Sequence, residues 1–160
     1  MSSSRDRTVA DSFSATRAAA FAGISRAMLN YLCREQIVVP SVLPSRGHGS
    51  PRAYSFGDVV ALRLVAKLSA AGVSVLRLRK AMQRLRKLHP EITLTSLPGS
   101  HVVTDGRDLY IKRKGETLER AMDGQFAFAF VVELEPIRNE VADGILKSQK
   151  AATGRARKVA

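Results

Sequence analysis

The sequence predicts an α+β fold in two parts, and three observations support this expectation. Before Pro90, apolar residues recur at helical spacing in short runs that begin after Ser and end at Gly or Pro. After Pro90, apolar residues alternate on either side of an Asp-Gly pair, which favours strands. The charge also divides there: residues 1–90 contain 15 Lys/Arg and 4 Asp/Glu, whereas residues 91–146 contain 6 and 10. We therefore expect two small units with opposite charge.

The first two elements are predicted to be short helices joined by a tight turn. Ser14 is suited to cap a helix over residues 15–21, which Gly23 would end. Ser25 would cap a second helix that reaches about residue 35, and its inward face is predicted to consist of Met28, Leu29 and Leu32.

The next segment reads as a strand, a loop and two further helices. Residues 37–39 are β-branched and stop before a proline, which suggests a short strand, and residues 45–52, SRGHGSPR, read as an exposed loop. Ser55 and Asp58 form a capping arrangement at the start of a third helix. A fourth helix, capped by Ser74, must end before Pro90.

The second unit is predicted to contain a hairpin, a strand and helices. Residues 102–104 and 109–111 flank the Asp-Gly turn, and a short helix is expected over residues 116–122. The segment FAFAFVVEL, residues 126–134, is apolar on both faces, so we expect a second subunit or the chain's own helices to cover it. The last helix is expected to end near Lys147.

The predicted divisions are a flexible arm at 1–12, a first unit at 13–90, an α+β oligomerisation module at 91–147 and a basic disordered tail at 148–160.

Two short helices, a tight turn and a loop between strands outline a winged helix-turn-helix, which suits the major groove of DNA. The order of residues from 13 to 88 resembles the MerR family of bacterial transcription regulators. The matching residues are Phe13, Ser14, Ala19, the run Gly23-Ile24-Ser25, Leu29, Tyr31, Arg52, Tyr54, Ser55, Asp58 and Leu62. The resemblance implies a sequence-specific DNA-binding regulator.

The DNA-binding residues that we predict come from the first two helices and the loop: Ser14, Thr16, Arg17, Ser25, Arg26, Asn30, Tyr31, Arg34, Arg46, Arg52 and Tyr54. Asn30 could pair with an adenine edge, and Arg26 with guanine or a phosphate. Alternatively, these polar side chains form an ordinary solvent-exposed helix face that binds no partner. The interface of a homodimer is predicted at Phe126, Phe128, Phe130 and Val132.

Departures from the MerR pattern narrow the expected function. Family members often carry Arg where this chain has Ala27 and Asn30, and the long dimerisation helix after the fourth helix is replaced by Pro90 and strand-like sequence. A lone Cys33 cannot form the cysteine cluster of the family's metal sensors. Residues 101–130 resemble, more weakly, the segment after the winged helix in some bacterial antitoxins, which implies a toxin protein as a further partner.

No nucleophile, phosphate-loop or metal-ligand motif is found, so we expect no enzyme activity, no cofactor and no metal. The net charge of +12 favours a polyanion as the binding partner. The expected protein is a bacterial, cytoplasmic repressor that binds double-stranded DNA at a palindromic operator as a dimer, without a membrane span. The alternatives are an architectural or excisionase-like DNA-bending protein and an interaction module whose charge serves solubility.

Overall fold

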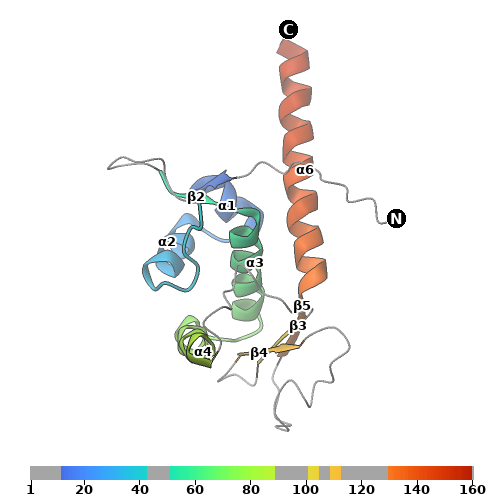
Figure 1. The fold of residues 1–160 in the computed structure, drawn as a ribbon. Helices are drawn as coiled ribbons and strands as arrows, with labels where there is room; N and C mark the ends of the chain where they lie inside the picture. The colour runs from blue at the N-terminus through green and yellow to red at the C-terminus, as the bar shows by residue number, and fades with distance from the viewer. Residues whose placement is uncertain (1–11, 43–50, 89–100, 105–108, 113–129, 160) are drawn as a thin grey trace.

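The computed structural model describes residues 12–42, 51–88, 101–104, 109–112 and 130–159. Within them the fold is α+β, as predicted: helices form most of the body, and two small antiparallel sheets lie at its edges (Figure 1). The elements in chain order are β1 (Phe13–Ser14), α1 (Ala15–Ala22), α2 (Arg26–Arg34), β2 (Ala53–Tyr54), α3 (Phe56–Ala70), α4 (Val75–Leu88), β3 (His101–Thr104), β4 (Leu109–Lys112), β5 (Phe130–Glu133) and α6 (Leu134–Val159).

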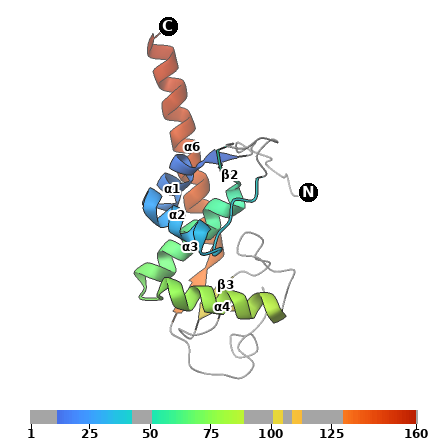
Figure 2. The ribbon, with the colours of Figure 1, turned by 90° about the vertical axis from the view of Figure 1, so that its left-hand side faces the viewer.

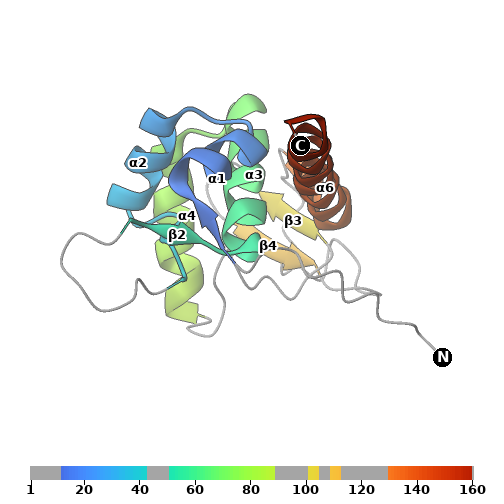
Figure 3. The ribbon, with the colours of Figure 1, turned by 90° about the horizontal axis from the view of Figure 1, so that it is seen from above.

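The core surrounds α3, the most deeply buried helix. Its residues Val59, Leu62, Val65 and Leu68 are buried, as the helical spacing predicts. Helices α1 and α2 lie on one side of α3, and α6 lies on the other (Figures 1 and 3). The sheet β4-β3-β5 lies near the end of α3 from which α4 leads off (Figure 2).

The predicted helix boundaries are confirmed by cap contacts in the first unit. The Ser14, Ser25 and Ser55 hydroxyls accept hydrogen bonds from the backbone N–H groups of the residues three positions later. The Ser74 hydroxyl likewise accepts from the N–H of Arg77 at 3.3 Å. Each bond satisfies a donor that a helix start leaves unpaired.

A buried carboxylate ties the start of α3 to the segment that precedes β2. Asp58 is fully buried, and its Oδ2 accepts hydrogen bonds from the Ser41 N–H, the Ser41 hydroxyl and the Ser55 N–H, each at 2.8 Å. The Ser55 hydroxyl in turn accepts from the Asp58 N–H at 3.1 Å, which completes the capping box. One side chain therefore caps a helix and holds a distant loop residue.

Two expectations about strands were wrong or incomplete. Residues 37–39 form no strand: Ile37 and Val38 are buried without strand pairing, and the bridge to β2 comes from Val42. Burial of the β-branched side chains, and not ladder pairing, explains the pattern. Of the segment 126–134, residues 126–129 lie outside the described residues, as do residues 116–122 of the expected short helix. Residues 130–133 form β5 as predicted, whereas Leu134 already begins α6. Pro136 lies in the first turn of α6, where a proline is tolerated.

The last helix is much longer than predicted. The sequence analysis ended it near Lys147 and expected a disordered tail, whereas α6 continues to Val159. Its first half packs on α3 and α1 through Leu134, Ile137, Val141 and Ile145. Once this half is formed, each further residue adds a helical hydrogen bond without a new nucleation step, so the helix extends into solvent.

An ion-pair cluster on the surface joins α6 to α3. Glu140 accepts hydrogen bonds from Arg63 Nη2 at 3.2 Å and from Lys67 Nζ at 3.0 Å. The hydrogen bond from Lys67, together with Arg63, holds the pKa of the Glu140 carboxyl below its ordinary value, against the opposing effect of burial. The folded state therefore favours the charged carboxylate.

Replacing Glu140 with Gln should lower the free energy of unfolding at pH 7 by at most about 1 kcal/mol, because the pair is partly exposed. Since the folded pKa is lowered, this contribution is present above the ordinary value of 4.5 and is lost as the pH falls through the folded value. Urea unfolding of both proteins between pH 3 and pH 7 should show the two stabilities converging at acid pH. A difference that stays constant across this range would contradict the ion-pair explanation.

Candidate nucleic-acid interface

The turn between α1 and α2 sets the angle at which α2 is presented. Gly23 has the left-handed φ of 70°, and its N–H donates to the carbonyls of Ala19 and Ala20 at the end of α1. The Ile24 N–H also donates to the Ala19 carbonyl, at 3.0 Å. Two residues after the glycine, Ser25 caps α2, which begins at Arg26. The turn from α1 to α2 thus takes three residues, and each of them makes a hydrogen bond.

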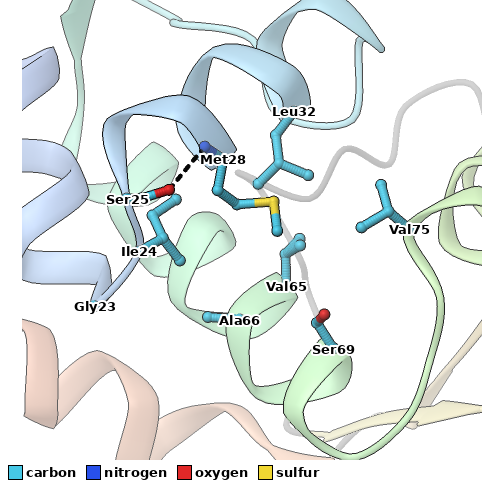
Figure 4. A pocket seen from close by; sticks show the side chains of 9 residues that line it. All are labelled: Gly23, Ile24, Ser25, Met28, Leu32, Val65, Ala66, Ser69 and Val75. Atoms are coloured by element: carbon cyan, nitrogen blue, oxygen red, sulfur yellow. Dashed lines mark hydrogen bonds between the residues drawn. The ribbon is translucent and has the colours of Figure 1, made fainter.

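An apolar groove of about 270 Å³ lies between the start of α2, α3 and the residue that begins α4 (Figure 4). Met28 extends across it toward Val65, and Leu32 and Val75 lie on its far side (Figure 4). The side of α2 that faces α3 is therefore apolar. The polar side chains of α2 therefore lie on the opposite side of the helix.

Replacing Gly23 with Ala should destabilise the protein by about 1–2 kcal/mol, because a side chain strains the left-handed conformation. The added Cβ would also lie 2.5 Å from Arg63 Nη1, the group that donates a hydrogen bond to the Ala22 carbonyl. Thermal unfolding measures the loss. Gly154, which has open space around it and no positive φ, is the matched control, and Gly154→Ala should not destabilise. Equal effects of the two changes would contradict this account of the turn.

The outer side of α2 carries Arg26, Asn30 and Arg34, which are exposed and follow one another at a spacing of four residues. Residues four apart lie above one another on a helix, so these three share one face. Leu29 and Leu32 are fully buried on the other face. The predicted division of α2 into a core side and a polar side is present in the structure.

Arg26 is connected to the start of α1. Its Nη1 donates a hydrogen bond to the Thr16 hydroxyl at 2.5 Å, and both side chains are exposed. Two predicted DNA-binding residues, ten positions apart in sequence, therefore meet at the surface. The remaining guanidinium donors of Arg26 are available for an anion or a base edge.

Asn30 is connected to the residue that precedes β2. The Arg52 Nη1 donates to Asn30 Oδ1 at 3.2 Å, across the surface between α2 and the end of the predicted loop. Asn30 is exposed, and its amide N–H groups are donors in addition to the oxygen that Arg52 engages. The structure brings these two predicted residues together.

Three more predicted residues border this surface. The Arg17 guanidinium lies 5.8 Å from the ring centroid of Phe13 and 5.5 Å from that of Phe21, at the start of α1. Arg34 lies 5.5 Å from the centroid of the half-buried Tyr31 ring. A ring attracts a guanidinium and so restricts where it points. Arg34 Nε also lies 3.9 Å from Glu35 Oε1. Basic groups thus flank Arg26 and Asn30 on both sides.

Tyr54 is the one predicted contact residue whose described position contradicts the prediction. It is fully buried in β2, where it pairs with Phe13 of β1, so its side chain offers no surface to a partner. Burial raises the pKa of the Tyr54 hydroxyl, Cys33 adds to the rise, and Arg52 opposes it. Tyr54 therefore packs in the core beneath the exposed residues of the interface and does not itself contact a partner.

The other predicted site residues are distributed as follows. Ser14 and Ser25 are exposed but already serve as caps. Arg46, Phe126 and Phe128 lie outside the described residues, and of Phe130 only the backbone is described. Val132 is partly buried against the core of its own chain, where its strand pairs with Val102. Its predicted place in a subunit interface therefore gains no support.

Sequence reasoning missed two residues that hold this surface in place. Arg63 of α3 donates to the last carbonyl of α1 and also to Glu140 of α6. Arg79 of α4 pairs with Glu35, the residue that ends α2, at 2.7 Å. The sequence does offer a signal for Arg63, because it is the one Arg within the apolar run of α3. Neither Glu35 nor Arg79 carried a local signal, because the pair forms only in the folded chain.

Two absences hold for the part of the chain that the structure describes. No group of three or more His, Cys, Asp or Glu residues is arranged to hold a metal ion there. None of the helices described is long and apolar enough to cross a membrane.

The chain is similar to proteins from Mycobacterium tuberculosis and Mycobacterium bovis that carry the name uncharacterized HTH-type transcriptional regulator. The identity is 32% over 112 residues, which is 69% of this chain and 48% of each relative. The chain thus spans about half the length of these relatives. No family model matches the chain.

Proposed function

We propose that this chain is a DNA-binding transcription regulator of the helix-turn-helix type, in which α2 reads bases in the major groove. The observation that carries the proposal is the outer face of α2, where Arg26 and Asn30 lie exposed and are oriented by Thr16 and Arg52. Guanidinium and amide groups are the side chains that recognise base edges most often. The likeness to relatives named HTH-type transcriptional regulators supports the same class.

The rest of the surface supplies the phosphate contacts that such a protein needs. Arg17 and Arg52 lie beside the α2 face, and Arg34 lies on it, so that all three add positive charge there. Phosphate contacts set the register of a protein on the duplex but carry no sequence information directly. In the finer form of the proposal, β2 and the loop before it form a MerR-like wing, with Arg46 and Arg52 contacting the backbone.

The remaining features of the proposed regulator come from the sequence. A dimer would place two copies of α2 on successive turns of a palindromic operator, and occupation of a promoter would repress transcription. In this form of the proposal the partners are double-stranded DNA, a second copy of the chain and, if the antitoxin likeness holds, a toxin protein.

Fluorescence anisotropy with the full chain tests the proposal. The labelled DNA comes from upstream of the protein's own gene, a scrambled duplex of equal composition is the control, and both are titrated from 50 mM to 400 mM salt. We expect the upstream DNA to bind at least tenfold more tightly. Equal binding with a steep salt dependence would instead indicate an architectural protein. Absence of binding at 50 mM salt would overturn the proposal.

A further inference from the structure

The second half of α6 leaves the body of the protein. Residues 151–159 are all exposed, and Val159 retains 89% of its accessible surface. In Figures 1 and 2 this half extends beyond α1 and β2, and Figure 3 shows α6 on the opposite side of α3 from α2. Fourteen residues of helix, from Leu146 to Val159, span about 21 Å. The projecting part is thus long enough to meet a large partner.

All the charges on this half are positive and lie on one side. Between Gly144 and Val159 there is no acidic residue, and the basic residues are Lys147, Lys150, Arg155, Arg157 and Lys158. At about 100° per residue, these five side chains fall within an arc of about 160°. Ala152, Ala156 and Val159 lie on the other side, in line with the buried Val141 and Ile145. The basic arc is centred to one side of the buried stripe, and its five residues are exposed.

The folded chain itself does not account for this arrangement. The helix dipole favours cations in the last turn, which covers Arg157 and Lys158 but not Lys147 or Lys150. Neighbouring cations three positions apart, such as Lys147 and Lys150, repel one another. A second copy of α6 would supply two further carboxylates, Glu135 and Asp143, because Glu140 is already paired with Arg63 and Lys67. Two carboxylates are fewer than the five cations of the arc. A linear polyanion matches an unbroken, one-sided row of cations.

We infer that the basic arc of α6, Lys147 to Lys158, binds the phosphate backbone of double-stranded DNA as a second contact, independent of base sequence. The inference rests on the proposed function and extends it: α2 selects the site, and α6 contacts phosphates beyond the bases that α2 reads. Each cation that neutralises a phosphate releases counterions and so steepens the salt dependence of binding.

The experiment repeats the salt titration on both duplexes with R155Q/R157Q/K158Q. Loss of three phosphate contacts should make the slope of log K against log salt shallower by about 2.7. Since the counterion contribution vanishes near 1 M salt, this slope change lowers the affinity at about 0.1 M salt by a factor of roughly 500 for the upstream and the scrambled DNA alike, so that their ratio is unchanged. R155K/R157K, which keeps the charge, is the matched control and should bind as the wild type does.

A second variant, Ala152→Pro, keeps every charge but interrupts the projecting helix, and we expect a severalfold loss of affinity on both duplexes. Full affinity of this variant would contradict an ordered basic face.

An unchanged salt slope for the triple variant, while the wild type still prefers upstream DNA, would overturn the inference and leave the proposed function standing. Failure of the wild type to bind either duplex would overturn both. If sedimentation shows that the triple variant no longer self-associates, this half of α6 binds a second copy of the chain, and the inference is also overturned.

Discussion

Replacing Asp58 with Ala should lower the free energy of unfolding by about 2–4 kcal/mol. The change removes the acceptor of three hydrogen bonds and leaves the partly buried Ser41 and Ser55 N–H groups without their partner. It also removes half of the capping box at the start of α3, which by itself costs about 1 kcal/mol. Because α3 is the centre of the core, the loss should appear as a cooperative shift of the whole unfolding transition.

Urea unfolding followed by circular dichroism measures this change. Asp58→Asn keeps one oxygen acceptor of similar size and should lose less than Asp58→Ala. Ser41→Ala removes the hydroxyl that donates to Asp58 while keeping the Ser41 N–H, so it should cost about 1 kcal/mol or less. A loss for Asp58→Ala no larger than that for Ser41→Ala would show that the buried carboxylate does not organise the start of α3.

Replacing Arg26 with Ala should weaken binding to the preferred DNA by about 10- to 100-fold, since a well-placed bidentate contact to a base contributes about 1–3 kcal/mol of discrimination. Arg26 is exposed and lies on the outer face of α2, so the change should leave the stability nearly unaltered. Binding to a scrambled duplex should weaken much less. The variant therefore loses selectivity, whereas neutralisation of the α6 cations does not.

Anisotropy with both duplexes measures the effect of Arg26→Ala. Two controls separate its possible causes. Thr16→Ala removes only the hydroxyl that holds Arg26 and should cost a fewfold in affinity. Arg77→Ala removes one exposed charge from α4 and should change both affinities alike. If Arg26→Ala weakened the two duplexes by the same factor, Arg26 would contact phosphate and not a base.

The elements with local signals were predictable from the sequence. Ser25 before α2 and the pair Ser55 and Asp58 before α3 act within one helical turn, so neighbouring residues suffice to place them. The Asp58 bond to Ser41, by contrast, spans 17 positions. The strands β1 and β2 contain two residues each and exist only because they pair with one another, which leaves no periodic pattern to detect.

The candidate site was predictable in its residue types but not in its contacts. The exposed face of α2 follows from helical spacing, yet nothing local indicated that Thr16 meets Arg26 or that Arg52 meets Asn30. Tyr54 was misjudged because tyrosine suits both a surface and a core, and only its pairing with Phe13 decides between them. The length of α6 was misjudged because its cations suggested a solvated chain, whereas the packed first half serves as the nucleus.

The contacts from Thr16 to Arg26 and from Arg52 to Asn30 have a thermodynamic consequence. Long side chains lose about 0.5–1.5 kcal/mol of rotamer freedom each when an interface immobilises them. Here that freedom is already restricted before a partner arrives, so the entropic cost of association is smaller. A hydrogen bond to a base then replaces one within the protein, which makes the net enthalpy modest. Calorimetry should therefore find Thr16→Ala binding with a more unfavourable entropy than the wild type.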